Sequence, residues 1–419
     1  MSKFLGYRCS LCGKEYPASF TGYTCPEDQG NLTVRLDIEK IRATVKPETI
    51  FASAERSLWR YEPLLPVQDP GFQDTPLHSA GWTPVYRFAE LEKKLRLGAL
   101  FVKDEGRNPT ASFKDRASAI LIARAKEIGA KTIVTASTGN AGAALAGMAA
   151  AAGWKAVIFA PKSAPPAKIA QLLVFNSDVI LVNGNYDAAF DLSVLAAEKY
   201  GWYCRNTGYN AFTAEGKKTA AYEIWEQLIV GKNVSPDRLA VFVSVGDGNI
   251  ISGIHKGFKD LVELGWIDRC PRIFGVQSEK SAAVYNAWAA GNETIVPVRA
   301  TTFADSISVD LPRDGVRALR AATESGGAYI AVPDETIYEG ISESGKYGVF
   351  AEPAGATAYV GLREAARRGW IGPNDQAVVV NTGSGMKDIR SAVAATGEAI
   401  SIDPTLDALE KLLRERKNA

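Results

Sequence analysis

A lysine at the start of an expected helix is the most reactive feature of the sequence. Lys114 follows residues 108–113, where a Pro-Thr turn leads to Ser112 as the expected N-cap. The positive end of the helix dipole destabilises an ammonium group in the first turn and lowers the pKa of the amine. An amine with a lowered pKa is a better nucleophile toward an aldehyde. Taken alone, the segment also fits a surface lysine that pairs with Asp115.

A second segment, residues 136–142, joins an apolar run to an alanine-rich helical pattern. Its small residues and free amides at a helix N-terminus are typical of an anion site. Ser137 and Thr138 would fit a substrate carboxylate, and the Asn140 amide would reach a ring hydroxyl. Close packing of the helix on a sheet is the structural alternative.

Two further segments place glycine turns directly after apolar runs. Residues 243–250 end in a turn whose backbone N–H groups can bind a phosphate without a cation. Residues 380–387 present Thr382, whose hydroxyl suits a ring nitrogen. The alternative for this last segment is a tight turn that needs positive φ at Gly383 or Gly385.

The elements that must position these segments are short apolar runs separated by helical patterns. The runs lie at residues 100–102, 132–134, 156–159, 179–182, 239–243, 273–276 and 377–380. This alternation predicts an α/β fold with parallel sheets covered by helices on both faces. Its extent exceeds one domain of about 100–150 residues, so two open, mostly parallel sheets are expected. Ligands bind at the carboxyl ends of such strands, where the unusual segments lie.

Three regions are expected along the chain. Residues 1–35 contain three of the five cysteines and are expected to form a small zinc-ribbon-like module. Residues 36–82 are predicted to be an irregular arm packed on the main body. Residues 83–419 form the main α/β region, with a smaller lobe at about residues 110–205.

Composition excludes several classes of function. The net charge of +1 gives no electrostatic reason to expect nucleic acid or an anionic membrane as partner. No apolar run reaches the roughly 18–20 residues that span a bilayer. Only two histidines occur, which disfavours a histidine-based triad or metal centre. Five cysteines do not form a secreted disulfide framework, so a cytoplasmic location is expected.

Taken together, the segments resemble the fold-type II pyridoxal-phosphate (PLP) enzymes, the tryptophan synthase β family. The resemblance covers about residues 80–395 and is closest to the threonine synthases. The motifs that carry it are Lys-Asp-Glu-Gly-Arg-Asn-Pro-Thr at 103–110, Ser-Phe-Lys-Asp-Arg at 112–116, Ser-Thr-Gly-Asn at 137–140, Glu-Gly-Lys-Lys-Thr-Ala at 215–220, Gly-Phe-Lys at 257–259 and Thr-Gly-x-Gly-x-Lys-Asp at 382–388.

The resemblance implies a cofactor site within residues 83–419. Lys114 would bind PLP as a Schiff base, Asn140 would bond its phenolic oxygen, and Thr382 would meet the pyridine nitrogen. The expected phosphate loop consists of Gly246, Asp247, Gly248, Asn249 and Ile250. The Gly-x-Gly in this loop lacks the third glycine of a dinucleotide-binding fingerprint, which disfavours a dehydrogenase.

The resemblance also implies a small amino-acid substrate. Ser137, Thr138 and Asn140 would flank its carboxylate. A threonine synthase is a carbon-oxygen lyase of threonine biosynthesis that converts O-phospho-L-homoserine and water to L-threonine and phosphate by γ-elimination and β-addition. The resemblance implies a homodimer. A scaffold that only binds an amino acid would need no Schiff-base lysine, so a non-enzymatic role is disfavoured.

The sequence departs from the threonine synthase pattern where a second phosphate must bind. Ala141 stands where many members have a hydroxyl residue, and the arginine that often precedes the 215–220 motif is absent. The possible substitutes are Lys217, Lys218, Arg313 and Lys346. Residues 303–309 resemble threonine and serine dehydratases. A dehydratase or a cysteate synthase-like enzyme therefore stays as the alternative.

The N-terminal cysteines have zinc-ribbon spacing. Cys9 and Cys12 form a Cys-x2-Cys pair, and Cys25 lies on a later turn. Asp28 stands where a fourth cysteine is expected. Two alternatives stay open: zinc bound by these four residues, or a metal-free turn held by packing.

Overall fold

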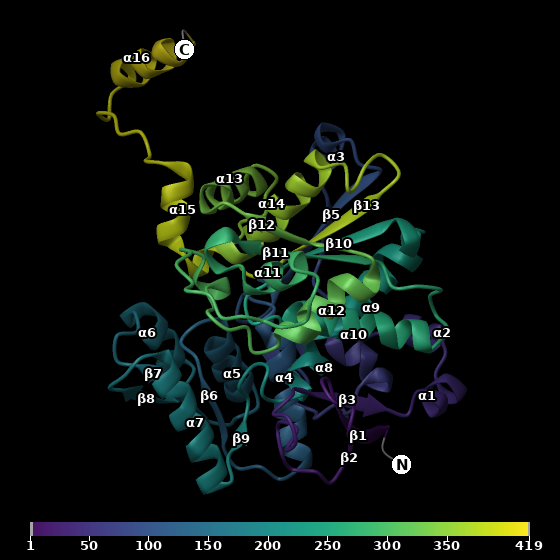
Figure 1. Ribbon diagram of the computed structural model, residues 1–419. Helices are drawn as coiled ribbons and strands as arrows, with labels where there is room; N and C mark the ends of the chain where they lie inside the picture. Colours follow the sequence, from purple (N-terminus) through teal and green to yellow (C-terminus); the bar gives the residue numbers. More distant parts are fainter. Residues whose placement is uncertain (1–2, 418–419) are drawn as a thin grey trace.

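The computed structural model describes residues 3–417, and this part of the chain contains three sheets (Figure 1). The predicted α/β fold with two open, mostly parallel sheets is confirmed. Within the described residues, no helix is both long and apolar enough to cross a membrane.

The larger sheet has six strands and is parallel except for one edge. In spatial order its strands are β12 (Tyr329–Val332), β11 (Arg272–Ser278), β10 (Leu239–Ser244), β13 (Gln376–Asn381), β5 (Ala99–Asp104) and β4 (Val85–Arg87). Only the β4–β5 pair is antiparallel. At the centre of the sheet, Val378 of β13 is paired with Val241 of β10 on one side and with Phe101 of β5 on the other. Every residue of β5 and β10 is buried, which explains their continuous apolar runs.

Helices cover both faces of this sheet. They are α3 (Ala89–Leu95), α9 (Thr219–Ile224), α10 (Asn249–Glu263), α11 (Ala283–Ala289), α12 (Gly315–Ser325), α13 (Asp334–Gly345) and α14 (Pro353–Arg367). Val241 and Val243 share a core with α10 and α12. Ala240 and Phe242 point the other way and share a core with α13 and α14.

The smaller sheet has four parallel strands. Their spatial order is β8 (Asp178–Val182), β7 (Ala156–Pro161), β6 (Ile133–Ala136) and β9 (Tyr203–Cys204). The helices around it are α4 (Lys114–Glu127), α5 (Asn140–Ala151), α6 (Pro166–Val174) and α7 (Tyr186–Tyr200). α7 packs on one face, and α5 joins α4 on the other. α8 (Phe212–Lys217) follows β9 and packs against α4, so it links the two sheets.

The N-terminal residues form a small antiparallel sheet, and the arm after it is partly helical. The strands are β1 (Phe4–Cys9), β2 (Glu15–Pro17) and β3 (Leu32–Leu36), in the order β2-β1-β3. The arm contains α1 (Ile38–Thr44) and α2 (Pro47–Phe51), so the expectation of an irregular arm was wrong. The structural reason is local, because Asp37 caps α1 and Pro47 opens α2.

The C-terminal helices extend from the large lobe. They are α15 (Ile389–Thr396) and α16 (Leu406–Lys417). α16 lies away from the body of the molecule (Figure 1), and Leu406, Leu409 and Leu413 are exposed on it.

Candidate active site

Lys114 lies in the first turn of α4, as predicted, but the helix begins at Lys114 itself and Ser112 is not its cap. Phe113 occupies the N-cap position, and the Ser112 hydroxyl is buried without a hydrogen-bond partner among the described residues. Backbone pairing fixes the helix start instead. The Phe113 N–H donates to the Thr382 carbonyl at 2.9 Å, and residue 112 pairs with Gly383. The loop after β13 therefore places Thr382 beside the lysine.

Asp115 does not pair with Lys114. It accepts hydrogen bonds from the Thr110 N–H at 2.6 Å and from the Thr110 hydroxyl. Burial raises the pKa of Asp115 to about 6. The alternative of a surface lysine paired with this carboxylate is therefore wrong.

Burial favours the neutral amine of Lys114. Burial lowers the pKa of Lys114 from its usual value, and the nearby cations Arg205 and Lys387 lower it further. Glu352 and Asp247 act in the opposite direction but do not cancel the effect of burial. The lowered pKa makes the side chain a better nucleophile toward an aldehyde than an ordinary lysine.

Asn140 is held by a carboxylate that the sequence did not reveal. Its amide Nδ2 donates to both oxygens of Glu352, at 2.9 and 3.0 Å. Glu352 is buried at the start of α14, and burial raises its pKa. It is the residue before a Pro-Ala-Gly run that opens an alanine-rich helix, and this was the only available signal. Asn140 and Glu352 join the small lobe to the large lobe at the site.

Thr382 has the free hydroxyl that a ring nitrogen requires. Its Oγ1 is buried and has no hydrogen-bond partner within residues 3–417. Gly383 and Gly385 do not have positive φ, so the tight-turn alternative is wrong. They are glycines because a Cβ would lie 2.4 Å from Glu352 Oε1 at Gly383 and 2.2 Å from the Phe350 ring at Gly385. This segment therefore fits closely against Glu352.

The loop 246–250 has the geometry of an anion cradle. A Cβ at Gly246 would lie 2.9 Å from Ile307 Cα, and Gly248 adopts φ +89°. Asn249 and Ile250 begin α10, so their backbone amides are at the positive end of the helix. Asp247 is half-buried and its pKa is raised by burial. Together with the unpaired Thr382 hydroxyl, this loop fits PLP.

The expected substrate-binding residues lie in the turn between β6 and α5. Ser137 and Thr138 are half-buried, and the Ser137 hydroxyl accepts from the Gly139 N–H at 3.3 Å. A Cβ at Gly142 would lie 1.9 Å from the Ser137 carbonyl oxygen, so only glycine permits this turn. The hydroxyls and the first amides of α5 can accept a carboxylate.

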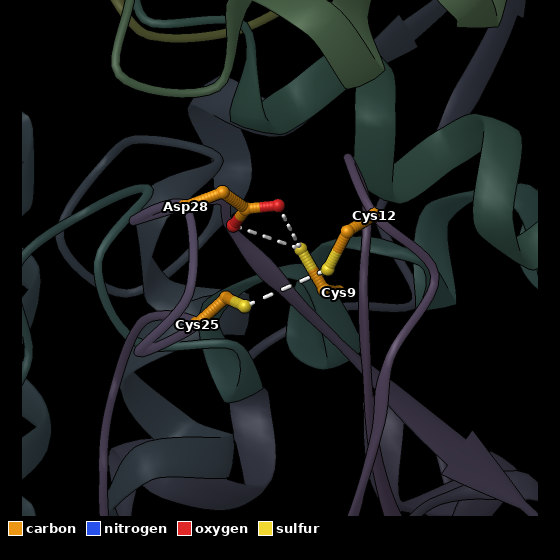
Figure 2. A group of neighbouring side chains, drawn as sticks. All are labelled: Cys9, Cys12, Cys25 and Asp28. Carbon is orange, nitrogen blue, oxygen red and sulfur yellow. Dashed lines mark hydrogen bonds between the residues drawn. The ribbon is translucent and has the colours of Figure 1, made fainter.

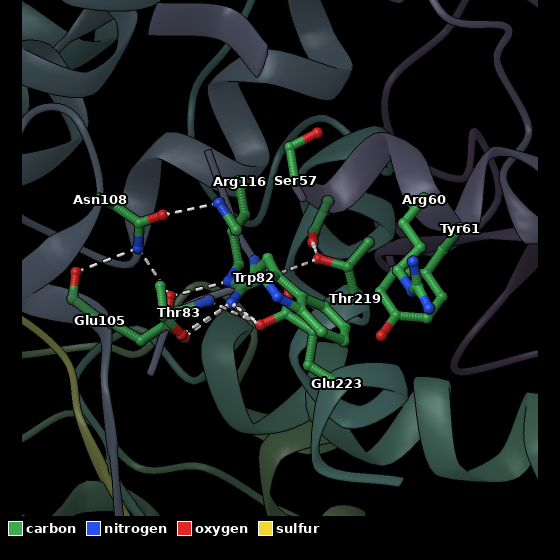
Figure 3. A network of polar contacts seen from close by, with 12 residues as sticks. Ser57, Arg60, Tyr61, Trp82, Thr83, Glu105, Asn108, Arg116, Thr219 and Glu223 are labelled. Carbon is green, nitrogen blue, oxygen red and sulfur yellow. Dashed lines mark hydrogen bonds and ion pairs between the residues drawn. The ribbon is translucent and has the colours of Figure 1, made fainter. Parts of the chain in front are cut away.

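A buried ion network anchors the helix that carries Lys114 (Figure 3). Arg116 donates to Glu105 at 2.7 Å and to Glu223 at 2.8 Å, and Lys103 donates to Glu223 at 2.6 Å. These four side chains are fully buried. Two cations and two anions compensate each other, and Thr83 also bonds to Glu105 at 2.7 Å. The network fixes the first turn of α4 against β5 and α9.

Of the four cations considered as possible substitutes for a phosphate clamp, three are exposed or already paired with carboxylates. Lys218 is buried and pairs with Glu215 and Asp260, each at 2.8 Å. Lys346 is exposed at the end of α13. The Arg313 side chain pairs with Asp187 near the surface. Only Lys217 is in the site, and the structure adds a cation that the sequence did not indicate, Arg205.

The four N-terminal candidates come together in the small module (Figure 2). Their ligand atoms all lie within 4.8 Å of one another. Cys12 Sγ is 3.7 Å from Cys25 Sγ, and Cys9 Sγ is 3.3 and 3.5 Å from the Asp28 oxygens. The Leu11 N–H donates to Cys9 Sγ at 3.3 Å. The module therefore contains a compact cluster of three thiols and one carboxylate.

Comparisons with known proteins identify the family to which this chain belongs. A family described as "Pyridoxal-phosphate dependent enzyme" matches residues 77–383. A threonine synthase of Methanocaldococcus jannaschii is 37% identical over 413 residues, which cover 97% of this chain and 99% of the relative. That of Methanosarcina acetivorans is 33% identical and covers 97% of this chain and 98% of the relative. The structure of threonine deaminase isoform 2 from Solanum lycopersicum has a TM-score of 0.66 at 24% identity, covering 78% of this chain and 90% of its own, and so shows the same fold.

Proposed function

Because the chain belongs to the PLP-dependent enzymes and, among them, to the threonine synthases, we propose that it converts O-phospho-L-homoserine and water to L-threonine and phosphate. The main support for this proposal is that Lys114 and Thr382 lie next to each other. The backbone hydrogen bond from Phe113 to Thr382 brings the Lys114 amine, whose pKa is lowered, next to the buried Thr382 hydroxyl, which has no partner among the described residues.

The residues divide the work of this reaction. When bound, PLP supplies the electron sink for a carbanion. Lys114 would hold the cofactor covalently, and its Nζ would then move protons at Cα and Cβ of the substrate. The Thr382 hydroxyl, in place of a carboxylate, would leave the ring nitrogen less protonated and so moderate carbanion stabilisation. Asn140 would bond the phenolic oxygen, and residues 246–250 would bind the cofactor phosphate.

A substrate panel tests the proposed reaction. Purified protein with PLP is incubated with O-phospho-L-homoserine, L-threonine or L-serine, and phosphate, 2-oxoacid and amino-acid products are measured together. We expect equal amounts of phosphate and L-threonine from O-phospho-L-homoserine only. Release of 2-oxoacids from threonine or serine without phosphate release would instead establish the dehydratase alternative.

We also propose that the N-terminal cluster binds one zinc ion. With Zn–S distances of about 2.3 Å and a Zn–O distance of about 2.0 Å, neighbouring ligand atoms of a tetrahedral site lie about 3.5–3.8 Å apart. The separation of 3.7 Å between Cys12 and Cys25 agrees with this geometry, and Cys9 Sγ lies 3.3 and 3.5 Å from the two Asp28 oxygens. All four ligand atoms lie within 4.8 Å of one another, so one ion could contact them all after small adjustments. The Gly30 N–H donates to Asp28 Oδ1 at 2.8 Å, which orients the carboxylate.

Metal analysis of protein purified without chelator tests the zinc proposal. We expect one equivalent of zinc, and its loss in the Cys12→Ser variant. Cys270→Ser is the matched control. Cys270 lies outside the cluster, so this variant should retain the metal. Less than a tenth of an equivalent of zinc in the unmodified protein would favour the metal-free turn.

The homodimer stays a prediction, which light scattering can check.

A further inference from the structure

Two buried cations beside the active-site lysine have no carboxylate partner. Arg205 and Lys217 are both fully buried. Among the ion pairs of residues 3–417, none includes either side chain. A buried cation without an ion pair is costly and calls for an anion from elsewhere. The adjacent Lys218 shows the contrast, because it has two carboxylate partners.

One guanidinium nitrogen of Arg205 is buried and has no hydrogen-bond partner among the described residues. Arg205 Nη1 donates to the Thr207 hydroxyl at 2.7 Å, and its Nε is 3.5 Å from the Ser118 hydroxyl. The nitrogen without a partner is Nη2. The guanidinium is therefore held by neutral groups and keeps a donor available for a ligand.

Lys217 is held by a single amide group beside the cofactor loop. Its Nζ donates to Asn249 Oδ1 at 2.7 Å, and the Thr213 hydroxyl bonds the same oxygen at 3.0 Å. Asn249 in turn donates to Asp314 at 2.7 Å. Burial, Lys114 and Arg205 hold the pKa of Lys217 well below its usual value, so an added anion would stabilise its charged form.

The fold brings the two cations to the lysine from different elements, and they are near enough to influence each other and Lys114 through charge. Arg205 directly follows β9, whose neighbour β6 leads to the turn expected to bind the substrate carboxylate. The Asn206 side chain fixes this arrangement by accepting the Ala136 N–H at 2.9 Å. Lys217 approaches from α8, next to the loop expected to bind the cofactor phosphate.

We propose that Arg205 and Lys217 form a second anion site, which binds the phosphate group of a phosphorylated amino-acid substrate. This inference rests on the proposed function and identifies the residues that select its substrate. The backbone amides of residues 246–250 suffice for the cofactor phosphate, so the two cations serve another anion. A guanidinium with a free donor and a nearby ammonium suit a phosphate dianion. A dehydratase substrate, which has no phosphate, would leave both cations unpaired.

The test compares Arg205→Gln and Lys217→Gln with the charge-removal control Lys346→Gln, whose side chain is exposed on α13. Three quantities are measured on each holoenzyme: the Kd of inorganic phosphate by calorimetry, the KM and kcat for O-phospho-L-homoserine, and the Kd of PLP by absorbance titration. We expect the Kd of phosphate and the KM to rise about 10- to 100-fold in both site variants. The Kd of PLP should change less than about threefold, and the control should match the unmodified enzyme.

Two results would overturn the proposal. One is an unchanged KM and phosphate affinity with weakened PLP binding, which would assign the cations to the cofactor phosphate. The other is the absence of phosphate binding to the unmodified holoenzyme, a measurement that needs no variant to fold. Arg205→Lys, which keeps the charge but loses the free Nη2 donor of the guanidinium, should recover part of the phosphate affinity.

Failure of this inference and failure of the proposed function give different results. If the unmodified enzyme produces no threonine from O-phospho-L-homoserine, the proposed function is wrong, whatever the phosphate affinity. If it does produce threonine but both site variants keep the unmodified KM, only the assignment of Arg205 and Lys217 is wrong.

Discussion

At the scale of single residues, the chemistry depends on the pKa of Lys114. Burial and Arg205 lower this pKa below 10.5, the usual value for a lysine. Only the neutral amine attacks an aldehyde, so covalent binding of PLP to the apoprotein should accelerate with rising pH and level off below pH 10.5. Stopped-flow absorbance measures this profile. A midpoint at or above the usual lysine pKa would contradict the account.

Arg205→Gln provides the second half of this test. Removing one nearby positive charge makes the ammonium form of Lys114 less unfavourable, so the midpoint should move to higher pH by up to about one unit. A shift to lower pH would show that Arg205 does not act on Lys114 through its charge.

Removing the unpaired Thr382 hydroxyl should affect the stability of the apoprotein and its affinity for PLP in opposite directions. Thr382→Val removes a buried donor without a partner, so the apoprotein should keep or slightly gain thermal stability. The affinity for PLP should nevertheless fall about 2- to 10-fold, because a hydrogen bond to the ring nitrogen is lost. Thermal melts and PLP titrations measure both, with Thr323→Val on the exposed side of α12 as control. Loss of apoprotein stability without loss of PLP affinity would show a purely structural role.

The sequence motifs led to three of the candidate site residues, whose roles stay predictions. Lys114 and Asn140 open α4 and α5, and Thr382 follows β13. The structure brings Lys114, Asn140 and the loop that begins at Thr382 together at Glu352. Glu352 and Arg205 were missed, because their importance comes from burial and from unpaired neighbours. Neither property is visible before the chain is folded.

At the scale of elements, the buried network of Arg116 holds α4 in place. Glu223 accepts from Arg116 at 2.8 Å and from Lys103 at 2.6 Å, with all three fully buried. Glu223→Gln leaves two cations facing only one carboxylate, so we expect a loss of about 3–5 kcal/mol in unfolding free energy. Glu339→Gln, which removes an exposed partner of Arg363, should cost less than about 1 kcal/mol. Urea unfolding measures both, and similar small losses would contradict a structural role for the network.

The strands that the sequence predicted are those with long apolar runs. β5, β10 and β13 are buried on both faces and therefore have continuous apolar sequences. β9 has two residues and β4 has three, which is too short for a recognisable period. The Ser112 cap failed because pairing with the loop after β13 determines where α4 begins, and such long-range pairing cannot be derived from local sequence.

At the scale of the whole molecule, the N-terminal module contacts the segment that supports the cofactor loop. Asn31 donates to the Arg313 carbonyl at 3.0 Å, and Arg317 donates to the Leu32 carbonyl at 3.1 Å. Between them, the Asp314 N–H donates to the Asp247 carbonyl at 2.8 Å. The module is therefore connected to the expected phosphate loop through one short segment.

This connection predicts that metal loss weakens cofactor binding. Cys12→Ser should lower the melting temperature and raise the Kd of PLP by about 2- to 30-fold, the range of couplings through packed contacts. The control Cys270→Ser should change neither quantity. A zinc-free Cys12→Ser protein with unchanged melting temperature and unchanged PLP affinity would show that the module is independent of the site.

Trapping the proposed covalent bond between the cofactor and Lys114 is the most direct test of the whole account. The holoenzyme is reduced with borohydride, digested, and mapped by mass spectrometry. We expect one cofactor adduct per chain, on the peptide that contains Lys114, and none in Lys114→Ala. An adduct on Lys217, or a full yield of adduct in Lys114→Ala, would contradict the account.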